Sequence, residues 1–427
     1  MSALFDSAMQ SLPAPAARAY RLLGLHPGPD FCADAATALL GVPAARAGEL
    51  LDELVESCLL GQDDEGRYRF HDLIKLHARN RAERDEPPEA RVAAIERMLI
   101  WYLAQAYRAD WIAIGPRLRV GGPPFDTPDA AECSDVVEAG PDLRDDVEAL
   151  DWLDRERGNL LAAQALAAEQ GLDTLAWRMC EPLWVLFLSR RYYADWVSSQ
   201  SVARDAAQRS GEAVGQAQAR RQLAAALLDL DRPHEAEAEL ACALELAVRS
   251  DHERLHAAVL GAIGEFRLAR DELPGAMSAF EQSRAISLRL GDTRGVLLQD
   301  TMIGRVMLRE SRHGEAYALL CRVLPGMAAF DERNQARVRV SLARAAAALG
   351  RPGEAAALFE QAAELYRRRG EAIGEIAALE GLADVAAAAG RPEEQRSYLE
   401  AIVERYEAGS AGERAEPYRR RLARLSC

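Results

Sequence analysis

A pattern that recurs every 39 or 40 residues through the C-terminal half of the chain constrains its fold more than any other feature. In five successive windows, a branched apolar residue is followed by alanine or glycine. These pairs are Leu223-Ala224, Ile263-Gly264, Ile303-Gly304, Leu342-Ala343 and Leu382-Ala383. A tiny residue at a fixed phase lets neighbouring helices approach closely, and a unit of this length buries its apolar face by stacking on copies of itself. The pattern therefore predicts a helical solenoid.

The residues that follow each pair indicate two helices per repeat. An alanine lies 13 residues after each of the first four pairs, and a large apolar side chain follows it: Ala236 and Leu240, Ala276 and Phe280, Ala316 and Leu320, and Ala355 or Ala356 with Phe359. Successive turns are marked by Arg191, Asp231, Asp271, Ser311, Gly350 and Gly390. We predict an all-α fold with a right-handed tetratricopeptide (TPR) superhelix over residues 211–427. A helical linker and an irregular capping repeat are expected over residues 147–210.

Charge and apolar pattern exclude several classes of protein. The formal charge of −15 disfavours a general nucleic-acid binder, because neutralising phosphates with basic side chains supplies most non-specific affinity. No apolar run reaches the ~18 residues that span a bilayer, and the N-terminus lacks the features of a signal peptide. The seven cysteines form no CxxC pair, which favours buried or incidental thiols over a metal or disulfide site. We expect a cytoplasmic protein that does not enter a membrane.

Residues 1–85 carry the pattern of a winged helix-turn-helix unit. Three stretches with helical spacing, within residues 16–25, 31–40 and 43–57, precede an acidic turn and an alternating run that is typical of a short hairpin. The third helix carries acidic residues against a single arginine, and a phosphate groove would repel it: Glu49, Asp52, Glu53 and Glu56 oppose Arg46. DNA binding therefore ranks behind a protein-contact or nucleotide-gating role.

Residues 86–146 are expected to connect this unit to the helical half. Residues 88–114 have the spacing of one long amphipathic helix, whose apolar side holds Ile95, Met98, Leu99, Tyr102, Ala106 and Trp111. Residues 115–145 hold glycine and proline without periodicity. A loop of this length is either mobile or functional, and we predict a mobile linker.

Four segments resemble one protein family. They are residues 21–31 (RLLGLHPGPDF), 50–55 (LLDELV), 68–73 (YRFHDL) and 149–160 (ALDWLDRERGNL). They are similar to the C-terminal winged-helix and TPR region of actinobacterial NB-ARC regulators, a group of STAND-class signalling ATPases that includes SARP-related proteins. The resemblance implies that Phe70-His71-Asp72 matches the MHD motif and that His71 contacts the β-phosphate of ADP. The alternative is that His71 is a wing residue whose ring makes its hydrogen bonds within the wing itself.

The chain departs from this family at the P-loop. A Walker A loop needs a glycine-rich turn that ends in Gly-Lys-Ser or Gly-Lys-Thr, because its amides and lysine surround the phosphates. The one lysine, Lys75, lies in the run Leu73-Ile74-Lys75-Leu76. We therefore expect the winged-helix and TPR arm of such a switch without its P-loop ATPase module, as a stand-alone form, a split partner or a truncated product.

The sequence holds no convincing catalytic or metal grouping. His252 and His256 share one helix face, but no third ligand can be named, so solvated or capping histidines are the better interpretation. No GxSxG elbow or dinucleotide fingerprint occurs. We therefore predict a protein that is not an enzyme and that uses no cofactor or metal.

The first helix of each repeat is expected to line a concave wall. Counting from the paired positions, the inward slots of greatest interest are Gln218, Arg221, Arg305, Arg337 and Arg344, with Glu380 and Asp384 in the last repeat. Guanidinium groups bind carboxylates or phosphates with two parallel hydrogen bonds, which favours an acidic peptide or a chain terminus as ligand. The alternative is a row of solvated arginines or internal salt bridges.

Three functions follow, in order of preference. The first is a non-enzymatic TPR protein of signalling or transcriptional regulation that binds a protein or peptide in its groove, with an acidic segment as the favoured ligand. The second is a split STAND-type switch subunit, which senses ADP or ATP through His71 together with a separate NB-ARC ATPase. The third is a DNA-binding regulator, which the acidic third helix disfavours.

Overall fold

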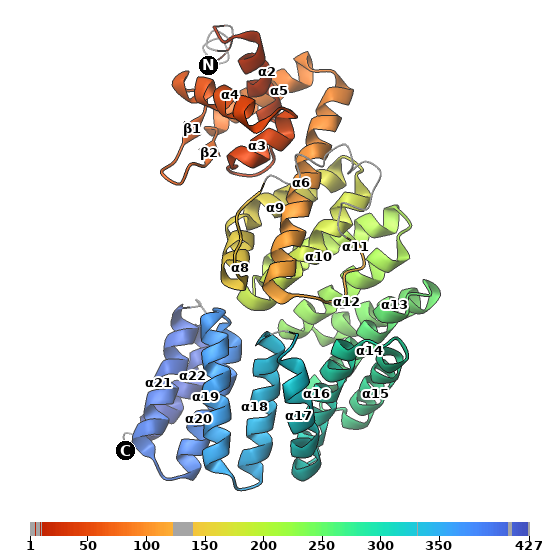
Figure 1. Cartoon of the computed structure of the whole chain (residues 1–427), viewed down its shortest axis with the longest axis vertical. Coiled ribbons are helices and arrows are strands. Elements are labelled where there is room, and N and C mark those ends of the chain that lie inside the picture. The colour runs from red at the N-terminus through yellow and green to blue at the C-terminus, as the bar shows by residue number, and fades with distance from the viewer. Residues whose placement is uncertain are drawn as a thin grey trace. The chain divides into compact units, whose positions relative to one another are not determined.

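The computed structural model describes residues 11–122, 140–330, 332–408 and 412–425, together with residues 5 and 9. These residues are mainly helical, as predicted, and their one sheet is a two-stranded hairpin (Figure 1). The chain forms two compact units. The N-terminal unit comprises Met1–Ala113, Arg119–Trp184 and Ser198–Ala219, and the repeat unit comprises Ile114–Leu118, Val185–Val197 and Arg220–Cys427.

Three short helices and a hairpin open the N-terminal unit. Helices α2 (Ala14–Leu23), α3 (Ala33–Leu40) and α4 (Ala44–Glu56) precede strands β1 (Gly61–Gln62) and β2 (Tyr68–Arg69), which pair antiparallel. Proline fits the start of a helix because its missing N–H has no partner there, and Pro13 and Pro43 occupy the N-cap positions of α2 and α4. Leu23, Leu39 and Leu51 are fully buried. The elements expected for residues 1–85 are therefore present in the expected order.

The long helix predicted at residues 88–114 is α6 (Pro88–Ile114), which follows α5 (Asp72–Asp85). Its predicted apolar side is buried except at Trp111, whose side chain is exposed and lies under the Arg119 guanidinium, 4.8 Å from the ring centre. The placement of Trp111 on the buried side is therefore wrong, because a cation covers that ring instead of the core. Residues 123–139 of the predicted mobile loop lie outside the described residues.

Most helices in the remainder of the described chain have 17 residues. Helices α8 (Asp146–Arg155), α9 (Arg157–Glu169), α10 (Asp173–Arg190) and α11 (Tyr193–Arg209) lead into the repeats. The repeats follow as α12 (Ala213–Asp229), α13 (Pro233–Arg249), α14 (Glu253–Ala269), α15 (Leu273–Arg289), α16 (Thr293–Arg309), α17 (His313–Met327), α18 (Glu332–Ala348), α19 (Pro352–Arg368), α20 (Ala372–Ala388) and α21 (Pro392–Ala408). A 3-10 turn η3 (Gly412–Ala415) and helix α22 (Glu416–Leu425) end the described chain.

The small and large positions of the repeat interlock as predicted. A Cβ added at Gly264 would lie 2.4 Å from the ring of Phe280, and one added at Gly304 would lie 2.9 Å from Leu320. In these two repeats the first helix thus has no side chain at the point where the second helix inserts a large one. The residues predicted to mark the turns all have a positive φ, from 57° to 72°: Arg191, Asp231, Asp271, Ser311, Gly350 and Gly390. This left-handed conformation ends a helix and reverses the chain.

Candidate partner-binding site on the repeat helices

Three of the five predicted contact residues come together on the repeat helices. Arg305 of α16 is partly buried, and Arg337 and Arg344 of α18 lie close enough to act on its charge. Burial, followed by repulsion from Arg337, lowers the pKa of Arg305 to about 10, although the nearby carboxylate of Glu265 opposes the change. Arg305 therefore keeps its charge at neutral pH in a poorly solvated position.

The two central arginines have weak partners. Nη1 of Arg305 points to the Met302 sulfur at 3.4 Å, and Nη2 of Arg337 lies 3.7 Å from the same sulfur. Nη1 of Arg337 donates to the Asn334 side-chain oxygen at a long 3.4 Å, and the Glu265 carboxylate lies 3.7 Å from Arg337, which is beyond hydrogen-bond distance. By contrast, Arg309 on the same helix as Arg305 is 2.8 Å from the Asp271 carboxylate. The guanidinium donors at Arg305 and Arg337 are thus poorly used within the chain.

Further side chains extend this group. Arg333, one turn before Arg337 on α18, donates to the Glu371 carboxylate at 2.9 Å, and Arg369 donates to its other oxygen at 3.0 Å. Tyr366 is buried beside them, and burial raises the pKa of its hydroxyl. We call Arg305, Arg333, Arg337, Arg344 and Arg369 the arginine cluster. Glu265 and Glu371 are the acidic side chains that the structure places against it.

The helices and the residue spacing that bring the arginine cluster together can be predicted in part from the sequence. Glu265, Arg305 and Arg337 belong to α14, α16 and α18, the first helices of three successive repeats. Residues four and seven apart share a helix face, which places Arg333, Arg337 and Arg344 in one row. Arg333 was not predicted from the sequence, although this spacing places it in the same row. Arg369 and Tyr366 could not be found in this way, because they reach the cluster from the end of α19.

Gln218 does not belong to this site. It lies in the N-terminal unit, is 1% exposed, and its amide nitrogen donates to the Glu181 carboxylate at 3.3 Å. The expectation that Gln218 lines an open groove is therefore wrong, because a buried carboxylate takes its side chain. Arg221 is partly buried on α12 and is not among the groups that act on Arg305. Its role in partner binding stays a prediction.

The two acidic slots of the last repeat are covered. The Tyr418 hydroxyl of α22 donates to the Glu380 carboxylate, and Nη2 of Arg421 lies 2.7 Å from Asp384. Helix α22 also packs apolar side chains against the last repeat, through Tyr418, Leu422 and Leu425. Asp384 is thus paired with a cation and Glu380 with a neutral hydroxyl, whereas Arg305 and Arg337 have no carboxylate within hydrogen-bond distance among the described residues.

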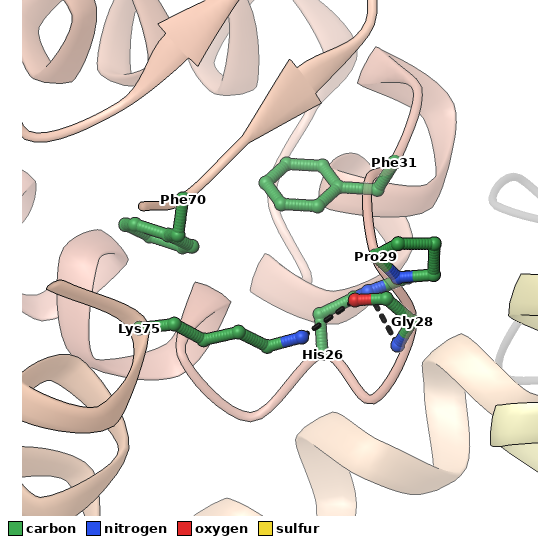
Figure 2. Close-up of a pocket in the computed structure, with 6 residues that line it drawn as sticks. All are labelled: His26, Gly28, Pro29, Phe31, Phe70 and Lys75. Atoms are coloured by element: carbon green, nitrogen blue, oxygen red, sulfur yellow. Dashed lines mark hydrogen bonds between the residues drawn. The ribbon is translucent and has the colours of Figure 1, made fainter. Parts of the chain in front are cut away.

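His71 occupies a different setting, at the start of α5. Its side chain is exposed and makes no capping hydrogen bond, while its carbonyl accepts from the amides of Ile74 and Lys75. The nearby recess in Figure 2 is lined by His26, Gly28, Pro29, Phe31, Phe70 and Lys75, and His71 is not part of it. The structure therefore shows no capping hydrogen bond that would hold the His71 ring within the wing.

The lysine of this recess has a structural role. The Lys75 ammonium donates to the Gly28 carbonyl at 2.5 Å, and the buried His26 ring accepts from the Gly28 amide (Figure 2). The His26 ring also contacts the Tyr102 hydroxyl at 2.9 Å. Burial lowers the pKa of His26 to about 3, so this ring is neutral at physiological pH. Lys75 therefore holds the loop between α2 and α3 in place, with its ammonium donors directed at carbonyl oxygens.

Two surveys of the described residues bear on other functions. Within these ranges, no group of three or more histidine, cysteine, aspartate or glutamate side chains could hold a metal ion. None of the helices in the described part of the chain has both the length and the apolar character that crossing a membrane requires. His252, one of the two paired histidines, caps α14 by accepting from the Leu255 amide at 3.1 Å, as the capping interpretation predicted.

Comparison with known proteins gives relatives of regulatory type. The chain is 31% identical to the regulatory protein AfsR of Streptomyces coelicolor over 381 residues, which cover 87% of this chain and 33% of that protein. AfsR of Streptomyces griseus gives 31% identity over 368 residues, again with 33% of its length covered. The chain thus spans about a third of these relatives. No protein-family model matches it.

Solved structures with a similar arrangement have low sequence identity. A STAND protein with a tetratricopeptide repeat sensor from Pyrococcus horikoshii is 12% identical, with a TM-score of 0.48 over 100% of this chain and 62% of that one. The Rap conjugation gene regulator of plasmid pLS20, solved with the Phr* peptide, is 13% identical, with a TM-score of 0.43 over 77% of this chain and 96% of that one. The helices of the described residues make the chain an all-α helical-repeat protein, and its sequence relatives above are regulatory proteins.

Proposed function

We propose that this chain is a non-enzymatic regulatory protein whose repeat unit binds an acidic segment of a protein partner at the arginine cluster. The observation that carries the proposal is the weak pairing of Arg305 and Arg337, whose donors reach a thioether, a neutral amide oxygen at 3.4 Å and a carboxylate 3.7 Å away. A partner carboxylate would offer charge-assisted hydrogen bonds that the chain does not supply. The regulatory relatives support this role.

A peptide titration tests the proposal. The probe is a fluorescein-labelled hexaglutamate peptide, whose binding is followed by fluorescence anisotropy. We expect Arg305→Glu and Arg344→Glu to weaken binding by about tenfold to a hundredfold, because hydrogen bonds to charged groups are lost and repulsion is gained. Arg309→Glu is the control, since Arg309 lies one turn away on the same helix but is exposed and paired with Asp271. Equal binding by all variants with unchanged helix content contradicts the proposal.

A second candidate function concerns residues 1–85 of the N-terminal unit, which we propose to be a winged helix. Leu73 and Leu76 on α5 are 42% and 56% exposed beside the exposed His71, which suits a docking surface for a separate ATPase module. DNA binding is less well supported, because α4 is acidic and Arg67 of the hairpin turn is paired with Asp30 and Glu156.

Calorimetry with ADP separates this candidate from the first. Titrations compare the wild type with His71→Ala, each alone and mixed with a separately encoded NB-ARC protein. Binding that depends on His71 in the mixture supports the switch subunit. Identical heats from both variants in both settings leave peptide binding by the repeat unit as the function.

A further inference from the structure

One hydrogen bond within the repeat unit joins residues 180 positions apart. Nη1 of Arg190, the last residue of α10, donates to the carbonyl of Gly370 at 3.0 Å. Gly370 lies in the loop between α19 and α20, well beyond the repeats that neighbour α10 in the sequence. In a stack of repeats each unit contacts its neighbours, so a contact over this separation is not a product of stacking.

The fit at Gly370 is specific. Its φ is +63°, and an added Cβ would lie 2.2 Å from Nη1 of Arg190. Gly291 occupies the corresponding loop between α15 and α16 with a φ of +66°, and an added Cβ there would meet nothing within 4 Å. The two glycines share a backbone conformation, but the close approach of an arginine occurs at one of them.

A second contact joins the same two parts of the repeat unit. Burial raises the pKa of the Tyr193 hydroxyl, and Arg414 of η3, near the C-terminal end of the described chain, lies close enough to oppose that change. Tyr193 also reaches Asp229 at 3.4 Å, and Arg191 pairs with the same carboxylate. The short segment 190–193 thus donates to the α19–α20 loop and lies near η3. We call Arg190, Tyr193, Gly370 and Arg414 the closing contact.

The closing contact is one residue away from the arginine cluster. Glu371 follows Gly370 directly and holds Arg333 and Arg369 with its two oxygens, at 2.9 Å and 3.0 Å. A carboxylate brought by a ligand would compete with Glu371 for these guanidinium groups. Glu371 belongs to the same chain segment as Gly370, whose carbonyl accepts from Arg190, so displacing Glu371 would bear on that hydrogen bond. The two features are therefore linked through three consecutive residues, 369–371.

We propose that the closing contact is a latch that holds the repeat unit closed, and that the arginine cluster binds an acidic partner in the unlatched state. The latch consists of exposed polar contacts, which water replaces at small cost, so both states are accessible. A partner that binds one state has its apparent affinity reduced by the fraction of chains in that state. Breaking the latch therefore raises the apparent affinity. The affinity part of this inference rests on the proposed function.

Two substitutions break the latch in different ways. Gly370→Ala places a methyl group where the Arg190 guanidinium lies, and Arg190→Ala removes the donor. Gly291→Ala is the matched control, because it carries the same strain of a positive φ without a neighbour. Full-length variants are compared by amide hydrogen exchange over residues 185–197 and 366–375, and by titration with the labelled hexaglutamate peptide.

We expect both latch variants to exchange faster than the control in these two segments and to bind the peptide severalfold more tightly. Equal exchange in Gly370→Ala, Arg190→Ala and Gly291→Ala overturns the latch, whatever the peptide does. Faster exchange with no peptide binding by any variant retains the latch and rejects the proposed function. Faster exchange with unchanged peptide affinity rejects the coupling between the latch and the arginine cluster.

Discussion

Arg67 and Glu156 form an ion pair that ties the β1–β2 turn to the junction of helices α8 and α9. The Glu156 carboxylate is 1% exposed and also accepts from the Asn159 amide at 2.7 Å. Burial by itself opposes the charge on Arg67, but hydrogen bonds and charges from Glu156 and Asp30 outweigh it and raise the pKa of Arg67. The segment at residues 149–160, which carries part of the family resemblance, therefore has a structural task within the N-terminal unit.

Removing this carboxylate is expected to loosen the hairpin. Glu156→Gln leaves Arg67 without its buried counter-ion and should cost about 2 to 4 kcal/mol, since breaking a buried pair is more costly than breaking an exposed one. Urea titration with hydrogen exchange of residues 61–70 measures the loss. Glu83→Gln is the control, because the Arg79–Glu83 pair is about half exposed and should contribute less than about 1 kcal/mol. Equal losses in both variants contradict the structural role of Glu156.

A larger residue at the small positions of the repeat should destabilise the repeat unit. Gly264→Ala places a Cβ 2.4 Å from the Phe280 ring, and overpacking of this kind costs about 1 to 3 kcal/mol. Gly353→Ala on α19 is the control, because an added Cβ there meets nothing within 4 Å and alanine favours the helix. Urea denaturation followed by circular dichroism compares the two. Destabilisation by Gly353→Ala that matches or exceeds that of Gly264→Ala argues against the interlocking described here.

The sequence predicted those features that repeat along the chain. The phase of Gly264 and Phe280 reports packing between consecutive helices, and the turn residues report the chain reversal at Asp231 and Gly350. Contacts that occur once leave no periodic signal. The bond from Arg190 to Gly370 could not be predicted for that reason.

The repeat pattern also could not predict which single polar side chains are buried. Gln218 fills a slot that the phase assigns to the groove, but the Glu181 carboxylate binds it inside the N-terminal unit. Arg305 and Arg337 were found because arginine at an inward slot is unusual in an acidic chain. Their weak pairing depends on how far the Glu265 carboxylate lies from them, and residue spacing in the sequence does not predict that distance.

His26 should make the N-terminal unit sensitive to acid. Its ring stays neutral in the folded chain down to a pKa of about 3, whereas the unfolded chain binds a proton at about 6.5. The unfolded state therefore gains protons first as the pH falls below 6.5, and stability decreases by at most about 1.4 kcal/mol per pH unit from this group. His26→Gln removes this dependence. Unfolding between pH 6.5 and pH 5, above most carboxylate titration, measures it. Parallel pH profiles for the two proteins contradict the assignment.

Glu265 provides the most discriminating test of the arginine cluster, because it is the carboxylate that lies nearest to Arg337 and that opposes the repulsion at Arg305. A bound acidic partner competes with Glu265 and is repelled by it, so Glu265→Gln should strengthen binding of the labelled hexaglutamate peptide by about three- to tenfold. The gain should decrease as salt is added, since the pair is about half exposed. Glu253→Gln on the same helix is the control, because Glu253 pairs with the exposed Arg289 at the other end of α14. Weaker or unchanged peptide binding by Glu265→Gln would mean that the acidic segment binds elsewhere on the chain.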